Sequence, residues 1–163
     1  MNTNRKNFAR RELLIALGLL PLAGFARAAA AAAPTQVQVW KEPTCGCCGD
    51  WIAHMEANGF KVFVNLGGTN ATRARLGIPK NMASCHTALV DGYAIEGHVP
   101  AREIRRLLRE KPKAVGLAAP GMPIGSPGMD TPAYGGKKQA YNVMLVARDG
   151  SASVYQRYEG NKS

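Results

Sequence analysis

The sequence predicts an α/β domain in which helices flank a mixed central sheet, and two observations carry this prediction. Short segments in which polar and apolar residues alternate recur along the chain, as is typical of half-buried strands. Between them lie stretches with apolar residues at helical spacing, which end at glycine or proline. The chain of 163 residues suits one domain of ordinary size, which we expect at residues 37–163.

The first 28 residues are expected to be an export signal that is removed from this domain. A basic stretch ending at Arg11 precedes an apolar run from Leu13 to Phe25, and the small-residue motif Ala26-Arg27-Ala28 follows. The run is too short and too interrupted for a membrane span, which needs about 20 apolar residues, so we expect no stable membrane anchor. The pair Arg10-Arg11 fits a twin-arginine signal as well as an ordinary secretory one.

The basic composition overstates the charge of the exported form. The full chain has a formal net charge of +10, and cleavage after Ala28 would remove five basic residues and one acidic residue, leaving +6. Basic proteins often bind nucleic acids or membrane surfaces, but an exported protein does not work where nucleic acid is found. We therefore interpret the remaining charge as a solvated surface and expect no nucleic-acid partner.

Four strands and three helices are expected in the first part of the domain, after a flexible alanine- and proline-rich segment at 29–36. Alternation predicts strands at 37–40, 60–64, 87–90 and 93–96. Helical spacing predicts helices at 49–58, 69–76 and 100–110. The order strand, helix, strand, helix, strand, strand, helix is that of a thioredoxin-like domain, in which a Cys-x-x-Cys motif joins the first strand to the first helix.

Turn residues predict how the remaining segments are connected. Asp91-Gly92 is a hairpin signal between the third and fourth strands. Residues 117–136 are rich in glycine and proline and include Met122 and Met129, which predicts an ordered loop. The segments at 141–147 and 153–158 flank a turn and are predicted to form a C-terminal β-hairpin.

Three cysteines within four residues are the strongest functional signal of the chain. Cys45, Cys47 and Cys48 form this triplet, and Cys85 follows later, next to His86. Disulfides within so short a segment close small, strained rings, and any full pairing of the four cysteines joins two members of the triplet. Purely structural bridging is therefore the weakest interpretation of these cysteines.

Metal binding and redox chemistry both remain open as roles of the triplet. Thiolates select soft ions such as Cu(I), and three thiols in four residues suit sulfurs that bridge several ions better than a single zinc site. Cys45 and Cys48 also have the spacing of a thiol–disulfide oxidoreductase. Cys47 has no obvious use in such an enzyme.

Other side chains are weaker candidates for the same chemistry. Met122 and Met129 would add thioethers to a copper site. His86 can face the same site as Cys85 only if the two residues lie in the loop before the strand, since neighbours in a strand point to opposite faces. His98 precedes a helix and is a candidate for a supporting role beside the ligands, whereas His54 is expected on the surface.

Four motifs in the order found here resemble the CopG-type family of bacterial copper-resistance proteins, and the likeness extends over residues 37–130, most of the exported chain. The motifs are Cys45–Cys48, Ser84–Ala88, Gly92–Pro100 and Gly121–Met129. The resemblance implies a thioredoxin-like fold, a periplasmic location and a cysteine-bridged cluster of several Cu(I) ions. The ligands that it implies are Cys45, Cys47, Cys48, Cys85 and, in an assisting role, His86.

The resemblance also implies what such a cluster would do. Copper tolerance would come from sequestration of the ions, or from interconversion of Cu(I) and Cu(II) by a copper oxidoreductase. Other periplasmic copper-handling proteins are the partners expected for either activity. A thiol–disulfide oxidoreductase that uses Cys45 and Cys48 remains the alternative.

Overall fold

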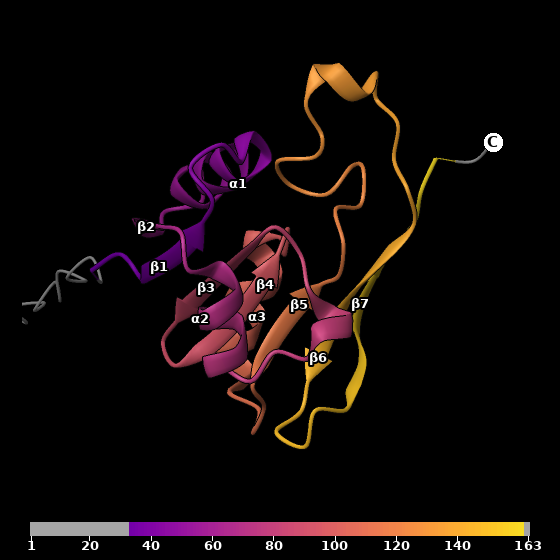
Figure 1. Cartoon of the computed structure of the whole chain (residues 1–163). Coiled ribbons are helices and arrows are strands. Elements are labelled where there is room, and N and C mark those ends of the chain that lie inside the picture. Colours follow the sequence, from indigo (N-terminus) through magenta and orange to yellow (C-terminus); the bar gives the residue numbers. More distant parts are fainter. Residues whose placement is uncertain (1–32, 162–163) are drawn as a thin grey trace, which may run out of the picture. The chain divides into compact units, whose positions relative to one another are not determined.

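A seven-stranded mixed sheet is the framework of the structure, a computed structural model that describes residues 33–161 (Figure 1). The expected export signal at 1–28 lies outside the described residues, as does the first half, 29–32, of the segment at 29–36. The strand order is β2-β1-β3-β4-β5-β6-β7. The strands are β1 Gln36–Lys41, β2 Lys61–Leu66, β3 His86–Val90, β4 Tyr93–Gly97, β5 Gly116–Ala119, β6 Tyr141–Val146 and β7 Ala152–Tyr158.

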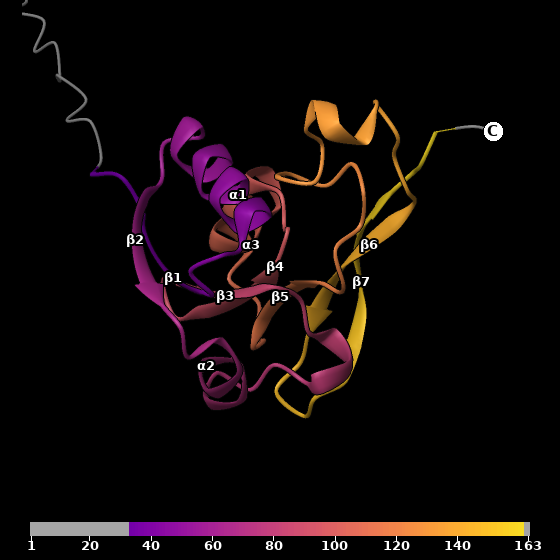
Figure 2. The ribbon, with the colours of Figure 1, turned by 45° about the horizontal axis from the view of Figure 1, so that its top comes forward.

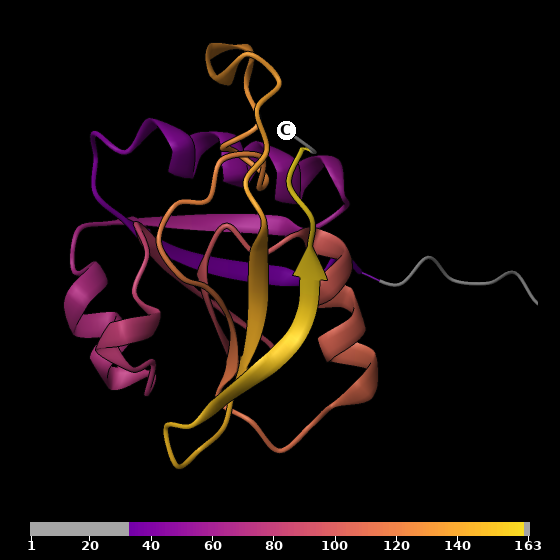
Figure 3. The same cartoon turned by 90° about the vertical axis from the view of Figure 1, so that its right-hand side faces the viewer.

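Three α-helices cover the two faces of this sheet. They are α1 Gly46–Ala57, α2 Thr69–Arg75 and α3 Ala101–Glu110, and short 3-10 helices lie at Lys80–Met82 and Pro132–Tyr134. Figures 2 and 3 show α1 and α3 together on one face and α2 on the other. The structure is therefore a mixed α/β fold, as the sequence predicts. Among the residues described, no helix is both long enough and apolar enough to cross a membrane.

Strand directions bring several chain segments to one edge of the sheet. β1 pairs in parallel with β2 and antiparallel with β3, and β4 pairs antiparallel with β3 and in parallel with β5. The carboxyl ends of β1, β4 and β5 therefore lie at the same edge as the start of β3. We call this the site edge, because it carries the residues from Cys45 to Cys48 and those just before His86.

The predicted helices are present, but the first begins earlier than the sequence indicates. α1 starts at Gly46 instead of Gly49, so Cys47 and Cys48 lie in its first turn and Cys45 is its N-cap. Glycine and cysteine are weak helix formers, which hides this turn from pattern analysis. Its consequence is that the helix start itself presents the cysteine triplet.

Both predicted hairpins are confirmed, whereas the predicted loop at 117–136 is wrong at its beginning. Asp91 and Gly92 have positive φ angles of 47° and 82° and connect β3 to β4, and β6 pairs antiparallel with β7. Strand β5 extends to Ala119, within the segment predicted as a loop. Its four residues are buried on both faces of the sheet, so they show no alternation that would indicate a strand.

The main core lies between the sheet and the two helices α1 and α3. Trp51 of α1 is fully buried there, and its Nε1 donates a hydrogen bond of 2.9 Å to the carbonyl oxygen of Val99. A smaller apolar cluster on the α2 side includes Ile78, Ala118 and Val146. The larger core fixes α1, and with it the cysteine triplet, against the site edge.

The loop after β5 folds back against the start of α1 and is ordered by its own hydrogen bonds. The N–H of Gly125 donates to the carbonyl of Met129 at 2.8 Å, and the N–H of Met129 donates to the carbonyl of Ser126 at 2.8 Å. Gly128 has a φ of +83°, and a Cβ there would lie 2.6 Å from the carbonyl oxygen of Cys47. The loop backbone therefore touches the helix backbone beside the triplet.

Replacing Gly128 with alanine is expected to lower the free energy of unfolding by about 3 kcal/mol, since it combines a left-handed backbone with overpacking. Gly136→Ala is the matched control, because Gly136 has a φ of +72° and no atom within 4 Å of the added Cβ. This control is expected to lower the free energy of unfolding by only about 1 kcal/mol. Urea unfolding of the two variants measures the difference, and equal losses would contradict the contact with α1.

Candidate metal centre

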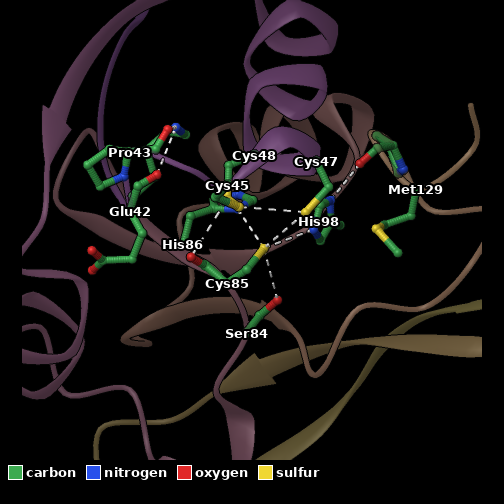
Figure 4. The surroundings of a disulfide bond; sticks show 12 residues. Glu42, Pro43, Cys45, Cys47, Cys48, Ser84, Cys85, His86, His98 and Met129 are labelled. Carbon is green, nitrogen blue, oxygen red and sulfur yellow. Dashed lines mark hydrogen bonds between the residues drawn. A yellow bond between two sulfur atoms is a disulfide. The ribbon is translucent and has the colours of Figure 1, made fainter.

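Four cysteine sulfurs converge where the first turn of α1 faces the residue before β3 (Figure 4). The Sγ atoms of Cys45, Cys47, Cys48 and Cys85 all lie within 4.8 Å of one another. Cys47 has a central position, with its Sγ 3.6 Å from that of Cys45 and 3.8 Å from that of Cys85. The fold thus gathers all the cysteines that the sequence singled out.

Two of the four sulfurs are joined in this structure. Cys45 and Cys48 form a disulfide with a Cα–Cα distance of 5.4 Å, and Cys47 and Cys85 are free and partly exposed. All four thiols can act together only after this disulfide is reduced. The structure therefore represents the oxidised form of the cysteine group.

The start of α1 favours the thiolate form of nearby cysteines, whereas the surroundings of Cys85 favour its protonated thiol. The free N–H groups at a helix start stabilise a nearby thiolate, and the first turn of α1 holds no acidic residue that would compete. Burial and the neighbouring Cys47 raise the pKa of Cys85 to about 12. Cys85 consequently keeps its proton at neutral pH until a cation replaces it.

Two histidines complete the surroundings of Cys85. The Nε2 of His98 lies 3.1 Å from the Sγ of Cys85, and the Nδ1 of His86 lies 3.4 Å from the same atom. Both side chains are 0% exposed. Only Cys85 lies in the loop before the strand, because β3 begins at His86 itself. The two side chains meet although the sequence predicts this only with both residues in the loop. From the sequence we expect His98 to support the ligands from beside them, whereas its Nε2 lies in direct contact with the thiol of Cys85.

Hydrogen bonding leaves nitrogen lone pairs at both rings. The Nδ1 of His98 donates to the carbonyl oxygen of Pro127 at 2.8 Å, so its Nε2 carries a lone pair toward Cys85 when the ring is neutral. The Nε2 of His86 is buried without a hydrogen-bond partner among the described residues. Burial lowers the pKa of His98 and, with His98 nearby, lowers that of His86 to about 3. Both imidazoles are therefore neutral at physiological pH, the form that binds metals.

A buried carboxylate fixes the segment that carries Cys85. Glu96 accepts hydrogen bonds from the Nε of Arg73 at 2.8 Å, the N–H of Ser84 at 2.7 Å and the hydroxyl of Thr87 at 2.6 Å. Arg73 also donates from Nη2 to the carbonyl of Ser84 at 2.6 Å. Burial raises the pKa of Glu96, and these donors oppose the rise. Both backbone groups of the residue before Cys85 are thus held in place.

Sequence reasoning missed Glu96 and Arg73 as supporting residues. The available signal was a carboxylate in the otherwise apolar strand Tyr93–Gly97, which needs a buried partner. His54 was wrongly expected on the surface. It is half-buried, and its Nε2 accepts the N–H of Ala101 at 3.1 Å at the start of α3.

The two methionines proposed as weaker candidates have different surroundings. Met129 is buried, and its Sδ accepts a hydrogen bond from the hydroxyl of Tyr134 at 3.4 Å. Met122 is 53% exposed and lines a cavity whose described lining includes none of the four cysteines. The structure therefore brings the cysteines and the two buried histidines together, whereas Met122 lies at a separate cavity.

Comparison with known proteins identifies the family. Two solved structures described as "Copper resistance protein copG", Form 1 and Form 2, are 48% identical to this chain, with TM-scores of 0.72 and 0.71. They match 78% and 77% of this chain and 99% and 98% of their own chains. The chain belongs to the CopG family. The resemblance inferred from the four sequence motifs is confirmed.

A second comparison covers a shorter part of this CopG-family chain. The family model described as "Protein of unknown function, DUF411" matches residues 82–129, which contain Cys85 and both buried histidines. None of the curated proteins matches the chain.

Replacing Glu96 with glutamine is expected to lower the free energy of unfolding by about 3 kcal/mol, because it leaves the charge of Arg73 buried without its partner. Glu159→Gln is the matched control, since Glu159 forms an ion pair with Arg157 in which both side chains are exposed. The control is expected to change stability by less than about 0.5 kcal/mol. Urea unfolding tests both variants, and a similar small loss in each would show that Glu96 does not hold the Cys85 segment.

The metal-free protein is expected to lose stability on mild acidification. Burial lowers the pKa of all three histidines, so below about pH 6.5 the unfolded chain binds protons that the folded one does not. The free energy of unfolding therefore falls as the pH falls, by about 2 kcal/mol at pH 5 from His86 alone. Urea unfolding at pH 7.5 and pH 5 measures the loss. His86→Gln should reduce it, and an unchanged loss in that variant would contradict the buried, neutral imidazole.

Proposed function

We propose that this CopG-family protein acts in copper tolerance by holding several Cu(I) ions in a cluster bridged by Cys45, Cys47, Cys48 and Cys85. The observation that carries this proposal is the convergence of four cysteine sulfurs within 4.8 Å at a helix start. The two similar solved structures are described as copper resistance proteins. Thiolates are the ligands that select Cu(I) among the common biological metals.

The central position of Cys47 favours a bridged cluster over a single-ion site. Its Sγ lies close to those of both Cys45 and Cys85, at 3.6 Å and 3.8 Å, where one sulfur could contact two ions. His86 and His98 would add imidazole nitrogens beside Cys85. The four cysteines form one group of potential ligands, and Cys85 with the two histidines forms a second. Neither group includes a carboxylate, so both fit a soft ion better than a hard one.

Loading of the cluster would require the reduced protein. Reduction of the disulfide between Cys45 and Cys48 consumes two electrons and two protons, and it frees the remaining sulfurs. Each thiol then gives up its proton to solvent as it binds Cu(I). Because the pKa of Cys85 is raised to about 12, its binding to copper should release close to one full proton at neutral pH.

A thiol–disulfide oxidoreductase is the second candidate, and the disulfide between Cys45 and Cys48 favours it. We infer a thioredoxin-like arrangement from the strand order β2-β1-β3-β4, with α1 and α3 on one face and α2 on the other, and this arrangement would suit such an enzyme. Against it, Cys47 and Cys85 are additional thiols beside the pair.

Interconversion of Cu(I) and Cu(II) is part of the proposal for the cluster and requires an external electron donor or acceptor.

We also propose that the protein works in the periplasm after removal of residues 1–28. The basic, apolar and small-residue parts of this segment support export. In that compartment the protein would exchange copper ions with other copper-handling proteins.

An anaerobic Cu(I) titration of the reduced, exported form is the decisive measurement. Several ions per chain should bind tightly and protect all four thiols from a thiol reagent. Cys47→Ser should abolish the multi-ion complex while leaving disulfide exchange by Cys45 and Cys48 largely intact. Thr44→Ser, an exposed change beside the triplet, should alter neither property.

The same experiment separates the two candidate functions. Weak copper binding, with disulfide exchange that does not depend on Cys47, would refute the cluster and support the oxidoreductase. Copper binding that survives Cys47→Ser unchanged would refute the bridging role of Cys47.

A further inference from the structure

A second group of sulfur ligands lies outside the cysteine site. Met82, Met122 and Met144 line one cavity of about 460 Å³. They come from three separate parts of the fold: the 3-10 helix before β3, the loop after β5, and strand β6. Five of the chain's six methionines lie in the described residues, so more than half of these share one cavity.

Core packing accounts for only part of this grouping. Met55 and Met129 are buried and serve as ordinary packing residues. Met82 is half-buried and packs against the smaller apolar cluster on the α2 side, Met144 is half-buried, and Met122 is exposed. Each of the three side chains therefore keeps some surface open to solvent, where an ion can reach it.

The cavity adjoins the segment that carries Cys85. Met82 lies three residues before Cys85. Gly121, next to Met122, donates its N–H to the carbonyl of Ala83 at 3.0 Å, and its own carbonyl accepts the hydroxyl of Ser84. The Oγ of Ser84 in turn lies 3.9 Å from the Sγ of Cys85. Two of the three methionines are therefore tied to the residues that directly precede Cys85.

The chemistry of the lining selects a soft monovalent cation. Besides the methionines, the described lining consists of proline, alanine and neutral polar residues, with no cysteine, histidine or carboxylate. Neutral thioethers bind Cu(I) and the similar ion Ag(I), whereas divalent ions favour charged or imidazole ligands. The methionine side chain has three rotatable bonds, which lets the sulfurs approach one ion from separate elements.

We propose that Met82, Met122 and Met144 form a thioether site that captures Cu(I) beside the Cys85 segment before the ion reaches the thiols. A thioether has no proton to lose, so capture by the methionines does not require a deprotonation. In the transfer, Cu(I)–thioether bonds break as Cu(I)–thiolate bonds form, the thiol proton goes to solvent, and copper keeps its oxidation state. The destination of the ion rests on the proposed function, but the methionine site itself does not.

The test uses the reduced, exported form with ¹³C-labelled methionine methyl groups and Ag(I) as a probe that undergoes no redox change. The methyl signals of Met82, Met122 and Met144 should shift together and reach saturation with one Ag(I) ion beyond those held by the thiols. The signals of Met55 and Met129 should stay in place. Signals of the three cavity methionines that do not move, or that respond at separate concentrations, would overturn the proposal.

Substitutions test the role of the site in delivery. Met122→Leu should weaken Ag(I) binding at the methionine site by about tenfold or more, as expected when a metal site loses a ligand. It should also slow Cu(I) uptake by the thiols without changing the final number of ions that they hold. Met55→Leu is the matched control and should change neither quantity. Unchanged uptake in Met122→Leu would overturn the role in delivery.

The outcomes distinguish this inference from the function on which delivery depends. If the methyl signals shift but the thiols bind no copper, the methionine site stands and the proposed cluster fails. If the thiols bind copper at the same rate in all variants and no methyl signal shifts, the cluster stands and the methionine site fails.

Discussion

The buried carboxylate of Glu96 is the interaction on which the geometry of the site depends. A carboxylate without exposure to water is costly unless several donors stabilise its charge, and here Arg73, Ser84 and Thr87 provide them. These donors come from α2, from the segment before β3 and from β3 itself. Satisfying one charge therefore fixes α2 and β3, and with them the segment that carries Cys85, against β4.

The loop after β5 holds the same site from the opposite side. Its Pro127 accepts the hydrogen bond that orients His98, and Gly128 lies against the backbone of Cys47. Helix α1 is thus confined between the main core and a loop that contacts two groups beside the sulfurs. Although the cysteine triplet belongs to the start of a single helix, its surroundings come from the start of β3, the residues after β4 and the loop after β5.

Local patterns predicted the features that depend on local chemistry. The turn at Asp91-Gly92, the C-terminal hairpin and the grouping of cysteines in one motif follow from residue types and spacing. Strand β5 could not be predicted, because small residues buried on both faces lack alternation. The approach of His98 to Cys85 was equally hidden, since it depends on the pairing of β3 with β4 and on the distant loop that contains Pro127.

The disulfide between Cys45 and Cys48 connects the metal-binding capacity of the protein to the oxidants of its surroundings. In an oxidising compartment this bond removes two of the four sulfurs from use, and it leaves Cys47 and Cys85 as the only free thiols. For the copper cluster that we propose, the number of ions held by a chain would then depend on the supply of reductant as well as on the supply of metal. Reductant would in this way limit copper binding even where copper is plentiful.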